Sequence, residues 1–435
     1  MKNARQTAFE ILNRIQKDNS YSNLVLDSFL EKSELSQVDK GLASAIVYGV
    51  VERLITLDFE LSDYLKQPLK KLKPQVLTVL RMGAYQILFM DKIPDSAAIN
   101  ESVKLTKSNG MAFASGLVNA VLRKVSVNGL SDTDNISVRY SAPVWLYNLW
   151  KDDYGKENSI KLLESTFGSV DAVIRVNTLK TSADKLIALL KDEGFDAEVL
   201  TDIENALVVR GNGAVHKTKA YNEGLFHVQD VASQLSAKAL DASENDIVLD
   251  VCAAPGGKSF TVAQYMKNKG QLYSMDIYPQ RLELIKNGCE RLGITNVSTV
   301  VNDAASHNEK IPKADRILCD VPCAGLGVIR KKPEIRYKQY NEVKGISELQ
   351  YTILCESSKY LKKDGILIYS TCSLNKDENE NVIKKFLSEH DEFESFAVLK
   401  DLKRVGEFTD YITLMPHIHN CDGFFIAGIR KIKDV

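Results

Sequence analysis

Residues 247–259 read Ile-Val-Leu-Asp-Val-Cys-Ala-Ala-Pro-Gly-Gly-Lys-Ser, and this stretch decides the fold. A short apolar run ends at Asp250, small residues follow, and a helical pattern begins at Lys258. Small residues let backbone N–H groups and a helix N-terminus approach a ligand closely. Cys252 stands where a P-loop needs its first glycine, and the dinucleotide pattern G-x-G-x-x-G is missing. The stretch therefore predicts a strand, a turn and a helix. The turn either binds a ligand or is a tight structural turn without one.

Strand and helix patterns alternate from this stretch to the C-terminus. We expect further strands at residues 271–276, 297–301, 316–320, 365–370 and 423–429. The expected helices cover 279–292, a long segment through Leu361, and 378–390. Such alternation implies βαβ units. We therefore predict an α/β domain with a mostly parallel twisted sheet over residues 236–435.

The chain before residue 236 shows two other patterns. Residues 1–125 are helical in pattern, beginning with apolar residues at i, i+3, i+4 and i+7 from Ala8 to Ile15. The further helices are expected at 42–51, 74–90, 97–107 and 112–125, and the turn-rich residues 126–135 are typical of a linker. Helices at 145–153 and 182–192 are then mixed with strands at 172–176, 197–200 and 206–209. We predict an all-helical domain at 1–130 and a small α+β domain at 140–235.

Composition limits the classes of partner. The 435 residues are 44% hydrophobic and 26% charged, with a net charge of -1, so any nucleic-acid contact needs local basic patches. There are two candidate patches. The first consists of Lys66, Lys70, Lys71 and Lys73, and the second is the run 330–332, which we expect beside the ligand site because it follows Cys323. Either patch could also be an ordinary solvated surface. No signal-peptide apolar region or membrane-spanning apolar run is present, so we expect a cytoplasmic protein without membrane contact.

Cysteine spacing argues against disulfides and metal. Seven cysteines without a C-x-x-C pair are atypical of a disulfide framework or a four-thiolate zinc site. His417, His419 and Cys421 share one face of an expected extended segment, but no fourth ligand is evident. We expect no metal site.

Carboxylates end successive expected strands. Asp276 is placed to accept hydrogen bonds from the hydroxyls of a ribose, and Asp303 to meet an adenine amino group. Either residue alone could instead cap a helix. With Asp250 and Asp320 at the ends of two other strands, they outline a nucleoside-shaped site.

Two cysteines follow apolar strands at the point where the chain turns out of them. Cys323 occurs in Asp-Val-Pro-Cys (320–323), and Cys372 occurs in Ser-Thr-Cys-Ser (370–373). If both strands belong to one parallel sheet, the sulfurs converge at its carboxyl edge, where such sheets bind ligands. A thiolate there would be a nucleophile. The alternative is inert packing, which fits Cys289, Cys319 and Cys355.

Several of these segments together resemble the RsmB/NOP family of RNA cytosine-C5 methyltransferases, which use S-adenosylmethionine. The segments are 250–259, 320–323 followed by Gly325-Leu326-Gly327, 370–373 followed by Asn375, Glu378 and Asn379, and also 175–177, 229–233 and 422–425. The helical start resembles the NusB type of RNA-binding domain. This domain order is similar to that of the branch acting on bacterial small-subunit (16S) ribosomal RNA.

The resemblance implies a Rossmann-like methyltransferase fold, an RRM-like small domain and a set of site residues. It implies that S-adenosylmethionine is bound or bordered by Cys252, Ala253, Ala254, Pro255, Gly256, Gly257, Lys258, Asp276, Asp303 and Asp320. It also implies that Cys372 attacks C6 of cytosine, that Asp320 stabilises the charge developed at N3, and that Cys323 assists product release. The expected partner is small-subunit ribosomal RNA before full subunit assembly, and the chain is expected to be a monomer. Alternatives are a transfer RNA methyltransferase and a noncatalytic RNA-binding or ribosome-assembly factor.

Overall fold

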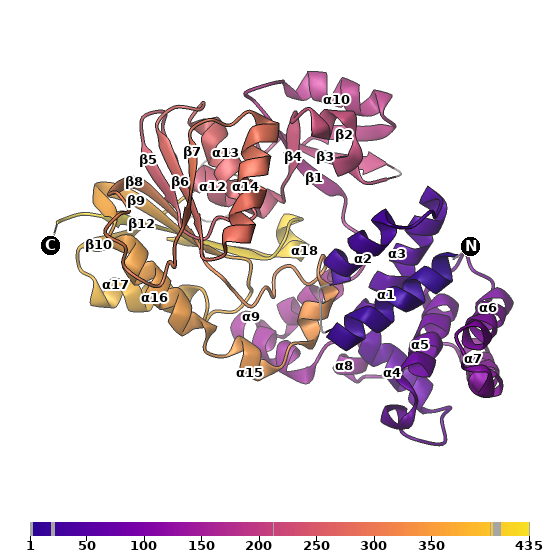
Figure 1. Cartoon of the computed structure of the whole chain (residues 1–435). Coiled ribbons are helices and arrows are strands. Elements are labelled where there is room, and N and C mark those ends of the chain that lie inside the picture. The colour runs from indigo at the N-terminus through magenta and orange to yellow at the C-terminus, as the bar shows by residue number, and fades with distance from the viewer. Residues whose placement is uncertain (1–2, 19–21, 212, 401, 403–409, 435) are drawn as a thin grey trace. The chain divides into compact units, whose positions relative to one another are not determined.

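The computed structural model describes residues 3–18, 22–211, 213–400, 402 and 410–434. The chain forms two compact units (Figure 1). One comprises Met1–Gly168 with Ile329–Lys338, and the other comprises Ser169–Val328 with Gln339–Val435. Within the described ranges, no helix is both long and apolar enough to cross a membrane.

Helices and short 3-10 turns are the regular secondary structure among the described residues of the first unit, and loops connect them. Its apolar residues recur at helical spacing and form one core, which includes Ala8, Val47, Leu80 and Val121. The helices are α1 (Ala4–Asp18), α2 (Ser22–Glu31), α3 (Gln37–Glu52), α4 (Leu54–Ser62), α5 (Pro74–Phe89), α6 (Asp95–Ser108), α7 (Ser115–Asn128), α8 (Ile136–Arg139) and α9 (Val144–Ser165), with short 3-10 turns at Leu69–Lys71, Ala112–Ala114 and Pro333–Tyr337. The helices predicted at 42–51, 74–90, 97–107 and 112–125 are confirmed. Helix α7 continues to Asn128 and so enters the predicted linker.

The segment Ile329–Lys338 belongs to this helical unit. Arg336 is almost completely buried there, and its guanidinium donates to the carbonyl oxygens of Glu52 and Thr166, each at 3.1 Å. The Tyr337 hydroxyl donates to the Val51 carbonyl at 2.8 Å. These bonds offset the cost of burying a charged group. The basic run 330–332 belongs to the same segment of the helical unit, and its expected place beside the ligand site stays a prediction.

The second unit contains a small antiparallel sheet with the strand order β2-β3-β1-β4. Its strands are β1 (Ala172–Val176), β2 (Phe195–Val199), β3 (Ala206–Gly211) and β4 (Phe226–Val228), and α10 (Ala183–Asp192) packs on it. Two short helical segments, Val215–Lys217 and α11 (Lys219–Asn222), precede β4. The three strands predicted in this region are confirmed. Strand β4 was not predicted, because three residues carry too little alternation.

The large sheet has the strand order β10-β12-β9-β8-β5-β6-β7, with β11 paired to β12. The strands are β5 (Ile247–Asp250), β6 (Gln271–Asp276), β7 (Val297–Val301), β8 (Ala314–Asp320), β9 (Leu361–Thr371), β10 (Phe393–Phe396), β11 (Tyr411–Leu414) and β12 (Phe424–Lys431). Strands β5 to β9 pair in parallel, and β10 to β12 are antiparallel. The predicted mostly parallel sheet with helices is confirmed.

Helices cover both faces of this sheet because alternate strand residues point to opposite sides. Val248 and Ile368 pack with α12 (Val231–Ala239), α13 (Gly257–Tyr265) and α14 (Pro279–Leu292). Leu249 and Leu367 pack with α16 (Ile346–Ser358) and α17 (Glu380–Glu389) on the other face (Figure 1).

Three predictions near the C-terminus were wrong in detail. The helix expected through Leu361 ends at Ser358, and Leu361 already belongs to β9, where it pairs with Ala314. The helix expected from Glu378 begins at Glu380, because Asn379, with φ -114° and ψ -103°, has a non-helical backbone. His417 and His419 lie in a short helix, α18 (Pro416–His419), rather than in an extended segment, so helical rather than strand geometry sets their directions. A further short helix, α15, covers Tyr340–Val343.

Candidate active site

The two cysteines that follow β8 and β9 come together at the carboxyl edge of the large sheet. Cys323 Sγ lies 3.0 Å from Cys372 Sγ, and both thiols are partly buried and free of disulfides. Their strands are parallel neighbours in which Asp320 pairs with Ser370. The two loops therefore leave the sheet side by side. The predicted convergence of the thiols is confirmed.

Backbone contacts hold the two cysteine loops against each other. The Gly327 N–H donates to the Cys372 carbonyl at 2.9 Å, and the Gly423 N–H donates to the Gly327 carbonyl at 2.8 Å. A Cβ at Gly327 would lie 1.9 Å from the Gly423 carbonyl oxygen, so only glycine permits this approach. The segment before β12 thus packs on the cysteine loops.

Asp320 connects the thiols with the glycine-rich loop. The Lys258 Nζ lies 2.6 Å from Asp320 Oδ2, and the Ser370 hydroxyl donates to Asp320 Oδ1 at 2.7 Å. Burial of Lys258, whose side chain is 14% exposed, acts to lower its pKa. The charge and hydrogen bond of Asp320, followed by Cys372 and Asp250, outweigh burial and raise the Lys258 pKa. Lys258 is therefore a cation beside the thiol pair.

The glycine-rich loop closes tightly between β5 and α13. Gly256 has φ 109°, which favours glycine, and a Cβ there would lie 2.6 Å from the Phe260 ring. The Ala253 N–H donates to the Met275 carbonyl at 2.7 Å, and Arg281 donates to the Ala254 carbonyl at 2.9 Å. The first turn of α13 therefore starts from a fixed loop with no side chain at its tightest point. Such a turn can receive a ligand at the helix N-terminus.

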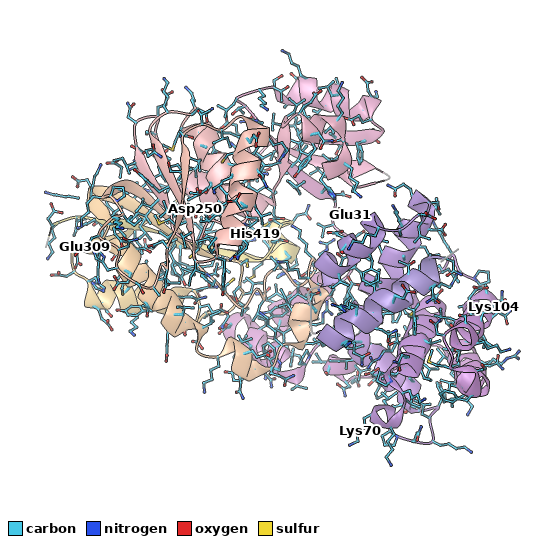
Figure 2. All side chains as sticks on the ribbon, in the orientation of Figure 1. Glu31, Lys70, Lys104, Asp250, Glu309 and His419 are labelled. Carbon is cyan, nitrogen blue, oxygen red and sulfur yellow. The ribbon has the colours of Figure 1, made fainter. Side chains whose placement is uncertain are left out.

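Asp250 carries a buried oxygen that lacks a partner. Its side chain lies among the strands of the large sheet (Figure 2) and is 2% exposed. The Ser259 hydroxyl donates to Oδ2 at 2.6 Å, whereas Oδ1 makes no hydrogen bond. Burial raises the pKa of Asp250 to about 7, against the lowering effect of the Ser259 bond, and the charge of Asp320 adds to the rise. Burial of an acceptor without a donor is costly for a charged carboxylate, in agreement with the raised pKa.

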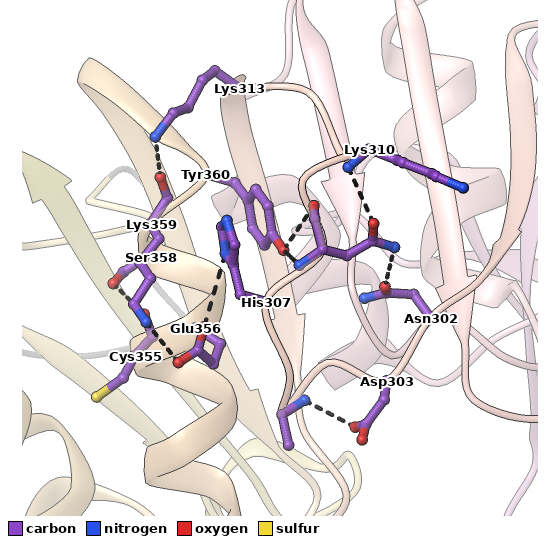
Figure 3. Close-up of polar contacts among 12 residues, drawn as sticks. Asn302, Asp303, His307, Lys310, Lys313, Cys355, Glu356, Ser358, Lys359 and Tyr360 are labelled. Carbon is purple, nitrogen blue, oxygen red and sulfur yellow. Dashed lines mark hydrogen bonds and ion pairs between the residues drawn. The ribbon is translucent and has the colours of Figure 1, made fainter.

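Asp276 and Asp303 both hold local turns. The Tyr278 N–H donates to Asp276 Oδ1, and Arg281 lies against Oδ2, each at 3.0 Å. The Asp303 carboxylate accepts from the Ala305 N–H at 3.0 Å in the loop after β7 (Figure 3). No helix follows Asp303 before β8 in the described chain, so this contact holds a turn and is not the helix cap of the alternative interpretation. The predicted contacts of both residues with a nucleoside stay predictions.

The segments 175–177 and 229–233 brace the small sheet against the helices of the large one. Buried Arg175 donates to Gln264 and to the Glu204 carbonyl, each at 3.3 Å. Asn177 donates to the carbonyls of Gly224 and Leu292, each at 2.7 Å. Arg175 and Asn177 thus make structural contacts within this unit.

The hydrogen bond between the thiols makes them unequal. This bond and burial raise the pKa of Cys323 well above its usual value, and the charges of Cys372, Glu378 and Asp320 act in the same direction. Cys323 therefore keeps its proton and can donate it to Cys372. Burial also raises the pKa of Cys289 to about 11 and that of Cys319 further, in agreement with inert packing of these two thiols.

Glu378 is a residue whose contacts the sequence did not reveal. It is completely buried and accepts hydrogen bonds from groups beside both cysteines. Its position in a family-like segment was the only signal. Within the described ranges, no group of three or more His, Cys, Asp and Glu side chains is placed to hold a metal ion, and the expectation for His417, His419 and Cys421 stays a prediction.

Comparisons with known proteins agree with this architecture. Residues 237–430 match the family 16S rRNA methyltransferase RsmB/F, residues 2–127 match the NusB family, and residues 142–216 match the ferredoxin-like domain of RsmF/B-like methyltransferases. The crystal structure of PH0851 covers 99% of this chain and 98% of its own, with 28% identity and a TM-score of 0.84. NSun6 from Pyrococcus horikoshii, solved with SFG, covers 67% of this chain and 99% of its own, with 25% identity and a TM-score of 0.62.

Curated relatives match over the full length. The protein named "Probable ribosomal RNA small subunit methyltransferase B" of Bacillus subtilis (strain 168) is 36% identical, and 98% of each chain is covered. The relative of the same name from Synechocystis sp. (strain ATCC 27184 / PCC 6803 / Kazusa) is 34% identical, covering 99% of this chain and 100% of its own. With its matched domains and paired thiols, the chain belongs to the RsmB/F family of 16S rRNA methyltransferases.

Proposed function

We propose that this protein transfers a methyl group from S-adenosylmethionine to C5 of a cytosine in small-subunit ribosomal RNA, through a covalent Cys372 adduct. The curated relatives support the RNA class through their names. The observation that carries the chemistry is the 3.0 Å approach of Cys323 Sγ to Cys372 Sγ at the carboxyl edge of the sheet.

The residues around the glycine-rich loop fit the cofactor. The loop ends in Gly256 and Gly257 at the N-terminus of α13, where backbone N–H groups can bind an anionic group of a ligand. Asp276 would accept hydrogen bonds from the ribose hydroxyls of the cofactor, and Asp303 would meet its adenine amino group. When bound, S-adenosylmethionine supplies an electrophilic methyl group. The relative solved with SFG gives further support.

Cys372 is the proposed nucleophile. Cytosine C5 is too electron-poor to take a methyl group directly. The Cys372 thiolate adds to C6, a sulfur–carbon bond forms, and the electrons of the C5–C6 double bond move so that C5 becomes nucleophilic. Asp320 hydrogen-bonds the pyrimidine edge, and the Lys258 ammonium at 2.6 Å from Asp320 reduces the cost of charge developed at N3.

Cys323 is the proposed assistant in product release. After methylation, a base takes the proton from C5, the electrons of that C–H bond re-form the C5–C6 double bond, and the bond between Cys372 and C6 breaks so that Cys372 leaves as a thiolate. The Cys323 thiol, held protonated, donates a hydrogen bond to that leaving sulfur. One thiol attacks and the other favours departure.

RNA contacts must come from local positive charge, because the net charge is -1. In the helical unit, Lys66, Lys70, Lys71 and Lys73 are exposed, and Lys70 lies at the surface (Figure 2). The target cytosine has to be unstacked to reach the thiols. We therefore propose RNA before full subunit assembly as the substrate, bound by a monomer. A noncatalytic factor would have no need of two thiols in hydrogen-bonding contact.

A methyl-transfer assay tests this function. Purified protein with labelled S-adenosylmethionine should label cytosine C5 in hypomethylated small-subunit RNA and leave transfer RNA unlabelled. Label in transfer RNA alone would support the alternative substrate. Absence of label in any RNA, with folded protein that binds the cofactor, would exclude the enzymatic proposal.

A further inference from the structure

Glu378 lies between the end of β9 and the start of α17, and it is 0% exposed. Its carboxylate accepts four hydrogen bonds. Oε2 accepts from the Ala324 N–H at 2.8 Å and from Gln350 Nε2 at 3.1 Å. Oε1 accepts from the Ser373 hydroxyl at 2.6 Å and from Asn375 Nδ2 at 3.1 Å. This number of donors matches the acceptor capacity of one carboxylate.

The donors come from both cysteine loops. Ala324 directly follows Cys323, and Ser373 directly follows Cys372. Each oxygen of Glu378 therefore serves one loop. Gln350, from α16, also donates to the Pro322 carbonyl at 2.9 Å and so ties the first loop a second time.

The geometry points to Glu378 as a positioning residue that keeps Cys323 and Cys372 in hydrogen-bonding register. The inference rests on the proposed roles of these thiols, because it explains how the attacking and the assisting sulfur are held together. Hydrogen bonds to an ionised carboxylate are stronger than hydrogen bonds between neutral groups, so Glu378 holds the two loops more firmly than a neutral acceptor would. The pKa of Cys323 is raised mainly by its hydrogen bond with Cys372, by burial and by the charge of Cys372. The negative charge of Glu378 adds a smaller effect in the same direction.

An amide cannot replace this carboxylate without loss. In Glu378→Gln, the side chain keeps its shape, but one oxygen becomes an NH2 group. Whichever way the amide turns, its NH2 faces donors of one loop, and the Ala324 N–H cannot rotate away. Ser373→Ala removes one donor and leaves the bonds to Ala324 and Gln350 intact, so it should loosen the Cys372 loop alone.

Formation of a disulfide between the two cysteines measures their register without any methyl transfer. Diamide takes up two electrons and two protons from the thiols as the S–S bond forms, and peptide mapping by mass spectrometry identifies the Cys323–Cys372 link among the seven cysteines. The matched control is Asp377→Asn, which removes one charge from an exposed neighbour whose carboxylate accepts from Asn381 at 2.8 Å.

We expect Glu378→Gln to slow this reaction about tenfold or more, since a shift of about 1 Å is enough for such losses between oriented groups. Ser373→Ala should slow it less, and Asp377→Asn should match the unsubstituted protein. In Glu378→Gln, the affinity for S-adenosylmethionine and the KM for this cofactor should stay unchanged while kcat falls. This pattern distinguishes misplaced thiols from partial unfolding, which would also weaken cofactor binding. An unchanged disulfide rate in folded Glu378→Gln would overturn the inference.

Ser373→Ala keeps the test decisive if Glu378→Gln does not fold, because an unchanged rate in folded Ser373→Ala also overturns the inference. Failure of the proposed function is recognised separately. It would appear as absent methylation in the unsubstituted protein, whereas the disulfide rates would still follow the contacts of Glu378.

Discussion

The Lys258 ammonium and the Asp320 carboxylate form an ion pair of 2.6 Å that joins the first turn of α13 to the end of β8. Their side chains are 14% and 24% exposed, so solvent screens the pair only in part. The same pair lies between the proposed cofactor loop and the thiols, and it is the structural link between the two halves of the site.

Lys258→Met should leave Asp320 without its cation in a mostly buried position. We expect a loss of about 2–4 kcal/mol in the free energy of unfolding, as is typical when one partner of a buried pair is removed. Urea unfolding measures this loss. Lys267→Met is the control, because its ion pair with Glu244 is exposed to solvent and should contribute little to stability. Equal losses of unfolding free energy in both variants would show that the ion pair of Lys258 and Asp320 contributes no more to stability than an exposed pair.

Asp250 should make stability depend on pH. Its pKa rises from 3.8 to about 7 on folding, so between these values the folded chain holds a proton that the unfolded chain has lost. The free energy of unfolding should therefore fall as the pH rises through this window, by at most a few kcal/mol, since one pKa unit corresponds to about 1.4 kcal/mol.

Asp250→Asn should remove this component, because an amide does not titrate. Urea unfolding between about pH 4 and pH 8 measures it in the variant and in the unsubstituted protein. Asp241→Asn, at an exposed position, should keep the original pH dependence. A profile of Asp250→Asn that parallels the unsubstituted protein would refute the assignment.

Gly256→Ala should damage the proposed cofactor loop. A Cβ at this position would meet the Phe260 ring at 2.6 Å, and φ of 109° is unfavourable for alanine. We expect about 1–3 kcal/mol of destabilisation and weaker binding of S-adenosylmethionine, measured by calorimetry. Gly345→Ala separates the effect of the backbone angle from the effect of the steric clash. At Gly345 φ is also unfavourable for alanine, at 93°, but no atom lies within 4 Å of the added Cβ. Gly345→Ala should lose some stability and keep its cofactor affinity.

The sequence predicted long, strongly patterned elements well. Strand β6, helix α14 and strand β7 have the predicted bounds, because glycine, proline and uninterrupted apolar patterns mark their ends. The strands β4, β10 and β11 were not predicted, since three or four residues carry little pattern and depend on a neighbour for pairing. The division into domains at 1–130, 140–235 and 236–435 stays a prediction.

The candidate site was predictable where it depends on strand ends. Parallel neighbours bring Cys323 and Cys372 to one edge, so their meeting follows from strand order. The pairing of Lys258 with Asp320, and the four donors around Glu378, depend on side-chain directions that only the packed loops determine. The roles of the individual residues stay proposals.

The most direct test of the account is the fate of the RNA adduct in the two cysteine variants. Cys323→Ala removes the thiol that assists release and should accumulate a covalent protein–RNA complex that survives denaturing electrophoresis. Cys372→Ala removes the nucleophile and should give neither the complex nor 5-methylcytosine. A stable complex in Cys372→Ala, or methylation by that variant, would contradict the central claim that Cys372 attacks and Cys323 releases.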